Sequence, residues 1–439
     1  MTEKFLHYLW RMKLLQHNSL QTTDGEKIFI IHAGEYNTDA GPDFLQAKIR
    51  IGDTLWAGNV EIHVRASDWN LHRHQQDKAY DNIVLHAVYE QDMPIAREDG
   101  SVIPCLELKD HVDVSIYSQY QALMLSTTSI PCAQQLHNVP PIIISQWLHR
   151  LLIERMEEKT LPVLHELQEN QRNWEETFYR FLAMAFGNSV NSAPFYLLAR
   201  SLPVKVLAKH KNNLFQLEAL LFGTAGFLGE TYADDYPNEL KKEFSFLRMK
   251  YGLQPLKHHT WKFLRLRPAN FPSLRIAQFA QLIHKSSHLF SQLLTITGTD
   301  NFIACFETAA SSYWNDHYRF DKKSVMHKKA MGRSSIESLT INTVVPFLFI
   351  YGKFRDEHQY CDRALLLLDD LRPEKNKVSA HWAALGIHAR SAYESQALLQ
   401  LHTNYCRQFR CLECSIGHRI LNHGLTSLTS AENKLPKTS

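Results

Sequence analysis

Residues 44–64 read FLQAKIRIGDTLWAGNVEIHV, and this stretch decides the fold of the N-terminal part of the chain. Every second residue from Leu45 to Ile51 is apolar, which is the pattern of a strand with one buried face. Gly52-Asp53 is a favourable pair for a two-residue turn, and a second strand-like run follows it. The stretch therefore predicts an antiparallel β-hairpin.

The segments on both sides of the hairpin extend it into an α+β domain. Apolar residues near helical spacing and an Ile-rich run precede the hairpin, and a second helical segment and an apolar run follow it. Ser67 or Asp68 is the expected N-cap residue of the second helix. The predicted order within residues 1–115 is α-β-β-β-α-β, with a helix at 3–16, a strand at 27–34, the hairpin, a helix at 67–80 and a strand at 82–90.

Residues 116–425 are predicted to form a large all-α domain. Strand patterns fade beyond residue 115, and longer segments with helical periodicity take their place. The last residues, 426–439, are predicted to be a disordered tail. The helices expected in this domain lie near 147–156, 172–186, 213–223, 237–250, 274–286, 334–351, 361–370 and 380–402.

The composition of the 439 residues fits a globular protein with two domains. Lys and Arg number 48 against 45 Asp and Glu, so any attraction to nucleic acid must come from local patches. The N-terminus carries charges throughout, unlike a signal peptide, and no run of apolar residues is long enough to predict a membrane-spanning helix. The seven cysteines do not follow the pattern of a secreted disulfide framework. We therefore expect a cytoplasmic protein without a membrane segment.

Asp43, Glu61 and His63 form the first candidate site. Asp43 lies at the start of one hairpin strand and Glu61 lies in the other, so strand pairing brings the two carboxylates together. Period two also places Glu61 and His63 on one face. Two neighbouring carboxylates favour a divalent cation, which in turn activates water for attack on phosphorus. The arrangement suits phosphodiester hydrolysis.

The order of elements and these residues resemble the PD-(D/E)xK nuclease superfamily, with Pro42-Asp43 matching its PD and Glu61-Ile62-His63 matching its ExK. The resemblance implies that Asp43 and Glu61 hold Mg²⁺ or Mn²⁺ together with the Ile62 carbonyl, and that the chain acts on DNA. His63 stands where that superfamily has lysine. Lysine is a cation that orients water, whereas neutral histidine is a base or a metal ligand. Two functions therefore stay open: an active nuclease, and a nucleic-acid-binding protein that no longer cleaves.

Further candidate ligands follow the hairpin, in a chain that contains 24 histidines. His74 and Asp77 share a helical face, and His86 lies on the next predicted strand. His72 and His74 would point about 200° apart on a helix, so His72 is expected outside the site unless this stretch is a loop. The HxHxxD string is similar to part of the HxHxDH pattern of binuclear metallohydrolases. A metallohydrolase of another substrate class, using His63, His74, Asp77 and His86, is therefore a third hypothesis.

Three cysteines near the end of the chain form a second candidate metal site. The spacing Cys406-x4-Cys411-x2-Cys414 is typical of zinc or iron–sulfur ligands. The expected fourth ligand is Cys132, with His402 and His418 as alternatives. A metal there would have a structural role, linking the end of the chain to the domain junction. Some nucleases of the superfamily named above, similar to helicase-linked and CRISPR-associated ones, hold a 4Fe–4S cluster through one distant cysteine that precedes the nuclease core, whereas Cys132 follows it.

Two basic stretches are candidate contacts for DNA. Residues 258–272, HHTWKFLRLRPANFP, interleave cations with aromatic residues. Lysines at 322, 323, 328 and 329, with Arg333, form the second stretch. Such stretches also occur on solvated loops and helix faces, so both interpretations stay open.

Over essentially its full length, the sequence is also similar to a bacterial family defined as a domain of unknown function. The strings that carry this similarity are NTDAGPDF, GNVEIHV, DWNLHRH, RPANFPSLRIAQFA and YCRQFRCLECSIG. This similarity implies no activity. The function expected from the residues is metal-dependent cleavage of DNA, with the two alternatives given above.

Overall fold

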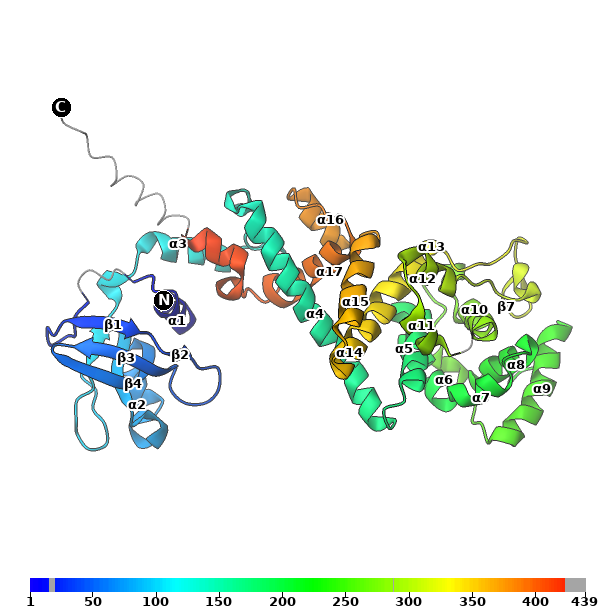
Figure 1. The fold of residues 1–439 in the computed structure, drawn as a ribbon, viewed down its shortest axis with the longest axis horizontal. Coiled ribbons are helices and arrows are strands. Elements are labelled where there is room, and N and C mark those ends of the chain that lie inside the picture. The colour runs from blue at the N-terminus through cyan, green and yellow to red at the C-terminus, as the bar shows by residue number, and fades with distance from the viewer. Residues whose placement is uncertain (16–19, 287, 423–439) are drawn as a thin grey trace, which may run out of the picture. The chain divides into compact units, whose positions relative to one another are not determined.

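The computed structural model describes residues 1–15, 20–286 and 288–422, which form two compact units (Figure 1). Of these described residues, the sheet unit contains 1–15, 20–147 and 402–422, and the helical unit contains 148–286 and 288–401. The first unit therefore extends beyond the predicted boundary at residue 115 and takes in the C-terminal segment. The tail predicted at 426–439 lies outside the described residues.

The sheet unit is built on a six-stranded mixed sheet, which agrees with the predicted α+β class. The order across the sheet is β1-β3-β4-β5-β6, and β2 pairs with β3. The first three of these are antiparallel, whereas β5 runs parallel to β4 and β6 parallel to β5. The strands are β1 (Ile28–His32), β2 (Glu35–Tyr36), β3 (Phe44–Ile51), β4 (Thr54–Arg65), β5 (Ile83–Glu90) and β6 (Cys105–Glu107).

The predicted hairpin is confirmed, and its register is fixed by a tight turn. Ile51 pairs with Thr54, so Gly52-Asp53 is the two-residue loop, and Gly52 takes the positive φ of 56° that glycine tolerates. The predicted burial of Leu45 is wrong, because a β-bulge at Gln46 (φ 57°) shifts the register. Phe44 is buried in its place. The bulge therefore changes the direction of the side chains at the start of β3, next to Asp43.

Helical segments before and after the sheet belong to the same unit. α1 (Glu3–Arg11) is shorter than the predicted helix at 3–16, and its apolar side chains Phe5 and Leu9 are fully buried. The indole N–H of Trp10 donates to the carbonyl of Ala33 at 2.9 Å and ties α1 to the end of β1. α3 (Val114–Met124) follows the sheet, and residues 415–422 are helical.

The helical unit contains helices and one small two-stranded sheet, β7 (His317–Arg319) with β8 (Lys322–Lys323). α4 (Pro141–Glu169) enters it from the sheet unit. The helices that follow are α5 (Trp174–Phe186), α6 (Asn188–Ser201), α7 (Val204–Lys209), α8 (Leu214–Thr224), α9 (Asp235–Tyr251), α10 (Pro272–Lys285), α11 (Leu289–Thr295), α12 (Thr299–Phe306), α13 (Arg333–Leu339), α14 (Val345–Arg355), α15 (His358–Asp370), α16 (Lys377–Ala384) and α17 (Ala392–Gln400).

Two parts of the helical unit need comment: the segment predicted as one helix at 380–402, and the junction between α13 and α14. The helix predicted at 380–402 is wrong in extent, because Gly386 (φ 85°) and the N-cap residue Ser391 separate α16 from α17. A π-helical turn, Thr340–Val344, joins α13 to α14. The resulting segment Arg333–Arg355 is long and apolar enough to cross a membrane, but 72% of its apolar window is buried, as in a core helix.

Glu218 in α8 is expected to make the stability of the helical unit depend on pH. Burial raises the pKa of Glu218 to about 7, and a hydrogen bond from the Tyr236 hydroxyl only partly offsets this. The folded state therefore keeps a proton that the unfolded state loses above about pH 4.5, and stability falls by about 3 kcal/mol as the pH rises to 7.

Glu218→Gln keeps an acceptor for Tyr236 but cannot ionise. We expect urea unfolding to show this variant gaining stability relative to wild type between pH 5 and pH 8. An equal difference at both pH values would contradict the assignment.

Candidate metal centre

Asp43 and Glu61 lie side by side, as the hairpin predicts. The backbone N–H of Ile62 donates to Asp43 Oδ2 at 2.9 Å, and the backbone N–H of Asp43 donates to Glu61 Oε2 at 3.1 Å. Burial is the largest cause that raises the pKa of Glu61, while the hydrogen bond with His74 lowers it. The strand pairing therefore fixes both carboxylates, with Glu61 buried and Asp43 partly open to solvent.

His63 lies two residues beyond Glu61 on β4, and its ring contacts that of His86 on β5. The two rings meet through His63 Nδ1 and His86 Nε2, which are 2.8 Å apart, and both side chains are buried. Burial lowers the pKa of His63 to about 2 and that of His86 to about 3, so both imidazoles are neutral. If His63 Nδ1 donates to His86, His63 Nε2 is left with a lone pair for a metal ion.

The helix predicted from Ser67 or Asp68 to Tyr80 is wrong. α2 (Asp68–Leu71) is a single turn, followed by two 3₁₀ turns at His74–Gln76 and Lys78–Tyr80. The Asp68 carboxylate accepts from the N–H of Arg65, and Ser67 bonds to Asp92, so neither side chain caps α2.

The break falls between His72 and His74. Arg73 takes the left-handed conformation (φ 62°), which turns the chain sharply at this point. Both histidines therefore face His63, and the expectation that His72 lies outside the site is wrong. This stretch is therefore a loop. A loop is the one condition under which the sequence analysis allows both histidines to be ligands.

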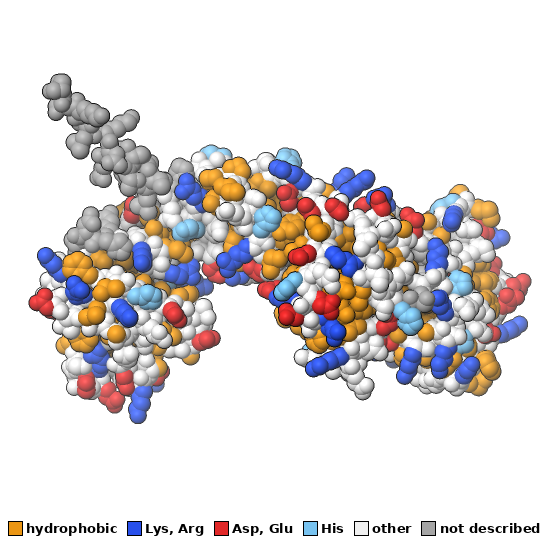
Figure 2. Space-filling model, in the orientation of Figure 1, with side chains coloured by type: hydrophobic (Ala, Val, Ile, Leu, Met, Phe, Trp, Pro, Cys, Tyr) orange, Lys and Arg blue, Asp and Glu red, His pale blue; other side chains and the backbone are white. Residues whose placement is uncertain are grey.

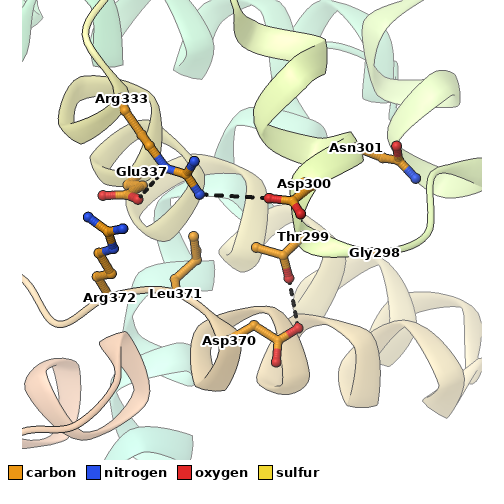
Figure 3. A pocket seen from close by; sticks show the side chains of 9 residues that line it. All are labelled: Gly298, Thr299, Asp300, Asn301, Arg333, Glu337, Asp370, Leu371 and Arg372. Carbon is orange, nitrogen blue, oxygen red and sulfur yellow. Dashed lines mark hydrogen bonds and ion pairs between the residues drawn. The ribbon is translucent and has the colours of Figure 1, made fainter.

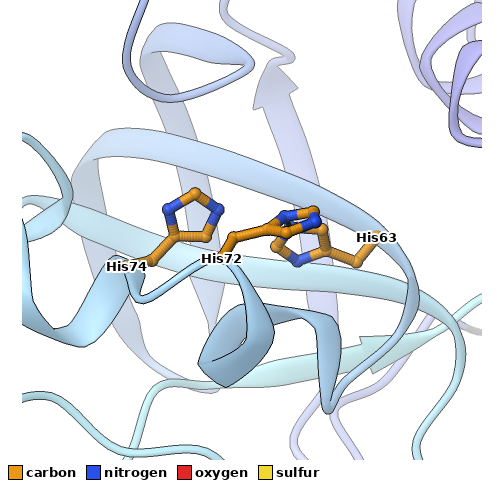
Figure 4. A group of neighbouring side chains, drawn as sticks. All are labelled: His63, His72 and His74. Carbon is orange, nitrogen blue, oxygen red and sulfur yellow. Dashed lines mark hydrogen bonds between the residues drawn. The ribbon is translucent and has the colours of Figure 1, made fainter.

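His63, His72 and His74 form a compact group, shown in Figure 4. One ring nitrogen from each lies within 4.8 Å of the other two. His63 Nε2 and His72 Nδ1 are 3.2 Å apart. Glu61 Oε1 lies 3.3 Å from His74 Nε2 and 3.6 Å from His63 Nε2. We call these four residues the His–Glu group.

Three donor separations in the His–Glu group are close to those of ligands that share one metal ion. Metal–nitrogen and metal–oxygen bonds of about 2.0–2.1 Å at tetrahedral angles place neighbouring donors about 3.3–3.4 Å apart. The three measured separations of 3.2, 3.3 and 3.6 Å bracket this spacing. His72 is exposed, so the group opens to solvent on its side.

Aromatic contacts hold His74 in place, whereas Asp77 has another role. The His74 ring stacks on Tyr80 at a centroid distance of 3.8 Å and meets Trp69 edge-on. The Asp77 side chain accepts from the N–H of Ala79 and caps a 3₁₀ turn. Asp77 therefore lies outside the His–Glu group, although the sequence paired it with His74.

His7 is a site residue that the sequence analysis missed. Its Nε2 lies 3.2 Å from Asp43 Oδ2, so this contact links α1 to the start of β3. Burial alone would lower the pKa of His7, but the hydrogen bond and charge of Asp43 outweigh it and raise the pKa. The helical pattern of residues 3–11 places His7 on α1 but gives no sign that it reaches Asp43.

His86 is expected to tune metal affinity although it is not a ligand. His86→Leu removes the hydrogen-bond partner of His63 while filling the buried space, and outer-shell changes of this kind cost about 10–100-fold in metal affinity. His86→Gln keeps a hydrogen-bonding side chain and should lose less. Competition with a chromogenic chelator measures both variants, and equal affinities in wild type and both variants would contradict the role.

The structure also brings together the four predicted cysteine ligands. Cys132, Cys406, Cys411 and Cys414 are all buried, and Cys132 lies near enough to Cys414 and Cys411 that, after burial, their charges also raise its pKa. His418, an alternative ligand, has its Nδ1 2.8 Å from the Tyr8 hydroxyl. Cys132 as the fourth ligand, with His402 and His418 as alternatives, therefore stays a prediction.

A polar pocket of about 540 Å³ lies in the helical unit, between α12, α13 and the end of α15 (Figure 3). The Arg333 guanidinium contacts Glu337 at 3.1 Å and Asp300 at 3.7 Å. Thr299 donates to Asp370 at 2.7 Å. These groups satisfy one another, and the pocket contains no counterpart of the His–Glu group.

The two basic stretches are partly structural. Trp261 is buried and its indole N–H donates to Ala225 at 2.7 Å, and Lys329 is buried and donates to Asn315 at 2.8 Å. Arg319 lies over the Phe263 ring. On the face in Figure 2, Lys and Arg side chains are interspersed with Asp and Glu. That face therefore carries no continuous basic stripe.

The sequence model of the DUF2851 family, described as proteins of unknown function, matches residues 3–377. The chain therefore belongs to this family. The match includes the whole His–Glu group, Asp43 and Cys132, and it ends before the three C-terminal cysteines. No curated protein and no solved structure gives a significant match.

Proposed function

We propose that this member of the DUF2851 family is a metal-dependent hydrolase that cleaves phosphodiester bonds in nucleic acid. The His–Glu group would hold one divalent transition-metal ion, and Asp43 would act beside it. The observation that carries the proposal is the convergence of one nitrogen from each of three histidines next to Glu61 Oε1. Chance packing seldom brings three imidazoles so close together beside a buried carboxylate.

The donor set favours zinc, manganese or another transition metal over magnesium. Mg²⁺ prefers oxygen ligands and retains several waters, whereas imidazole suits Zn²⁺, Fe²⁺ and related ions. The sequence predicts an acidic Mg²⁺ or Mn²⁺ site, but histidines outnumber carboxylates around Glu61. We therefore expect nitrogen-rich coordination, with Asp43 outside it.

Each residue has a separate task in the proposed reaction. His63, His72, His74 and Glu61 would hold the ion, which would supply a Lewis acid for the negative charge that develops on a phosphate oxygen. His86 orients His63, and the Asp43 N–H orients Glu61. The Asp43 carboxylate, aligned by the Ile62 N–H and by His7, accepts a proton from the water whose oxygen bonds to phosphorus. The P–O bond to the leaving oxygen breaks, and that oxygen takes up a proton from solvent.

The substrate class is inferred from the sheet. A β-meander followed by a crossover to a parallel strand, with Asp43 before β3 and Glu61 in β4, is similar to the arrangement of PD-(D/E)xK nucleases. The histidine-rich centre supports a different substrate class. His63 stands where the PD-(D/E)xK pattern has lysine, so the centre departs from that of the nucleases. A metallohydrolase acting on another ester is therefore the second candidate.

The test compares nucleic acids with a simple phosphodiester. Purified full-length protein is incubated with single-stranded DNA, double-stranded DNA, RNA and bis(p-nitrophenyl) phosphate, each with Zn²⁺, Mn²⁺ or Mg²⁺. Cleavage of a nucleic acid that depends on Zn²⁺ or Mn²⁺ supports the proposal. Cleavage of the small ester alone selects the second candidate, and salt-sensitive binding without cleavage selects a non-catalytic binding protein.

A further inference from the structure

A second cluster of metal-binding side chains lies in the sheet unit and takes no part in the proposed hydrolysis. It consists of Cys132, Cys406, Cys411 and Cys414, which we call the cysteine cluster. Each is 7% exposed and none forms a disulfide. Burial raises the pKa of Cys132 and of Cys406, and the nearby cysteines raise it further: Cys414 and Cys411 for Cys132, and all three others for Cys406. Cys132 is 274 positions from Cys406 in the sequence, so the fold, not local spacing, unites the set.

The backbone conformation of the C-terminal segment, residues 402–422, positions its three cysteine thiols. A π-helical turn, Leu401–Cys406, ends at the first of them, and Phe409 (φ 52°) reverses the chain before the 3₁₀ turn Cys411–Glu413. Gly417 lies so close that a Cβ there would be 2.1 Å from the Cys411 carbonyl oxygen. Only glycine fits this approach.

Burial is the largest cause that raises the pKa of the Cys414 thiol, and the nearby backbone of Gly417 and Ile416 and the Trp147 side chain offset it in part. Cys361, outside the cluster, instead donates its S–H to the Phe349 carbonyl, as an ordinary thiol does.

The spacing of the sulfur atoms distinguishes between two metals. Four sulfurs that share one zinc ion at about 2.3 Å lie less than 4 Å apart. Among the residues that the structure describes, the histidine trio has ligand atoms that all lie within 4.8 Å of one another, and the four cysteines are not found as such a group. An iron–sulfur cluster holds its cysteines farther apart, because they bind different iron atoms.

We propose that Cys132, Cys406, Cys411 and Cys414 bind an iron–sulfur cluster that fastens the C-terminal segment to the rest of the sheet unit. The segment also contacts this unit through the Tyr8–His418 hydrogen bond (2.8 Å) and the Trp147–Tyr405 ring contact (5.3 Å). These contacts set the segment in place, and the cluster cross-links it. The proposal does not depend on the hydrolytic activity.

The experiment measures iron, acid-labile sulfide and zinc in full-length protein purified without oxygen, together with its visible absorption spectrum. We expect iron and sulfide in equal amounts and a brown protein. Cys132→Ser should lose most of the iron, while Cys305→Ser, a change at a thiol outside the cluster, should retain it. His72→Ala should also retain it, which separates this site from the His–Glu group.

The result does not depend on how well the variants fold. In wild-type protein, iodoacetamide labelling followed by mass spectrometry should leave the four cysteines unmodified until the cluster is destroyed by acid or chelator. Zinc without sulfide, lost in Cys132→Ser but not in His72→Ala, would overturn the proposal. So would four native thiols that react freely, or disulfides among them.

Discussion

Asp43→Asn is expected to lower the rate of phosphodiester hydrolysis by about 10²–10⁴-fold, the usual contribution of a general base. Asparagine keeps an oxygen that accepts the Ile62 N–H, so the start of β3 is preserved. The amide cannot take a proton from water. Turnover is measured under saturating metal, and the metal content of the variant is measured in parallel.

The matched control for this change is Asp39→Asn, at an exposed carboxylate in the same loop. It should retain wild-type activity. Full activity of Asp43→Asn would remove Asp43 from the mechanism. Loss of both metal and activity would show that Asp43 is a ligand, as the sequence pattern first indicates, and would contradict its assignment as the proton acceptor.

His72→Ala is expected to weaken metal binding by more than about 100-fold, beyond the range of outer-shell changes. The His72 side chain is exposed, so its removal leaves the core intact. His74 is less suitable because its ring stacks on Tyr80. In wild type, metal at 100 times its Kd should stabilise the sheet unit by about 2.7 kcal/mol.

Thermal unfolding with and without Zn²⁺ or Mn²⁺ measures this effect. The metal-induced rise in Tm should disappear in His72→Ala and persist in His137→Ala, a change at another exposed histidine of the same unit. An unchanged rise in His72→Ala would mean that the ion, if bound, sits elsewhere. The assignment of His72 to the centre would then be wrong.

The sequence predicts much of the sheet unit because local signals determine it. The apolar alternation and the Gly52-Asp53 turn specify the hairpin, and the hairpin alone places Asp43 beside Glu61. The strand predicted at 82–90 is also specified by a local signal, because its run of apolar residues forms β5. Long segments with helical periodicity in the helical unit are found with boundaries shifted by a few residues.

The rest of the site depends on backbone conformations that the sequence does not signal. Gln46 and Arg73 both take positive φ, although neither is a residue type that favours it. The bulge at Gln46 buries Phe44, and the turn at Arg73 brings His72 into the site. His7 reaches Asp43 from another element, and such a contact is set by tertiary packing.

The central claim is that three histidines and Glu61 hold one metal ion. The most direct test is an anomalous-difference map from crystals of the full-length protein grown with Mn²⁺ or Zn²⁺. The account predicts one peak about 2.0–2.2 Å from His63 Nε2, His72 Nδ1, His74 Nε2 and Glu61 Oε1. A peak bound by the Asp43 and Glu61 carboxylates without the histidines, or no peak in this region, would contradict it.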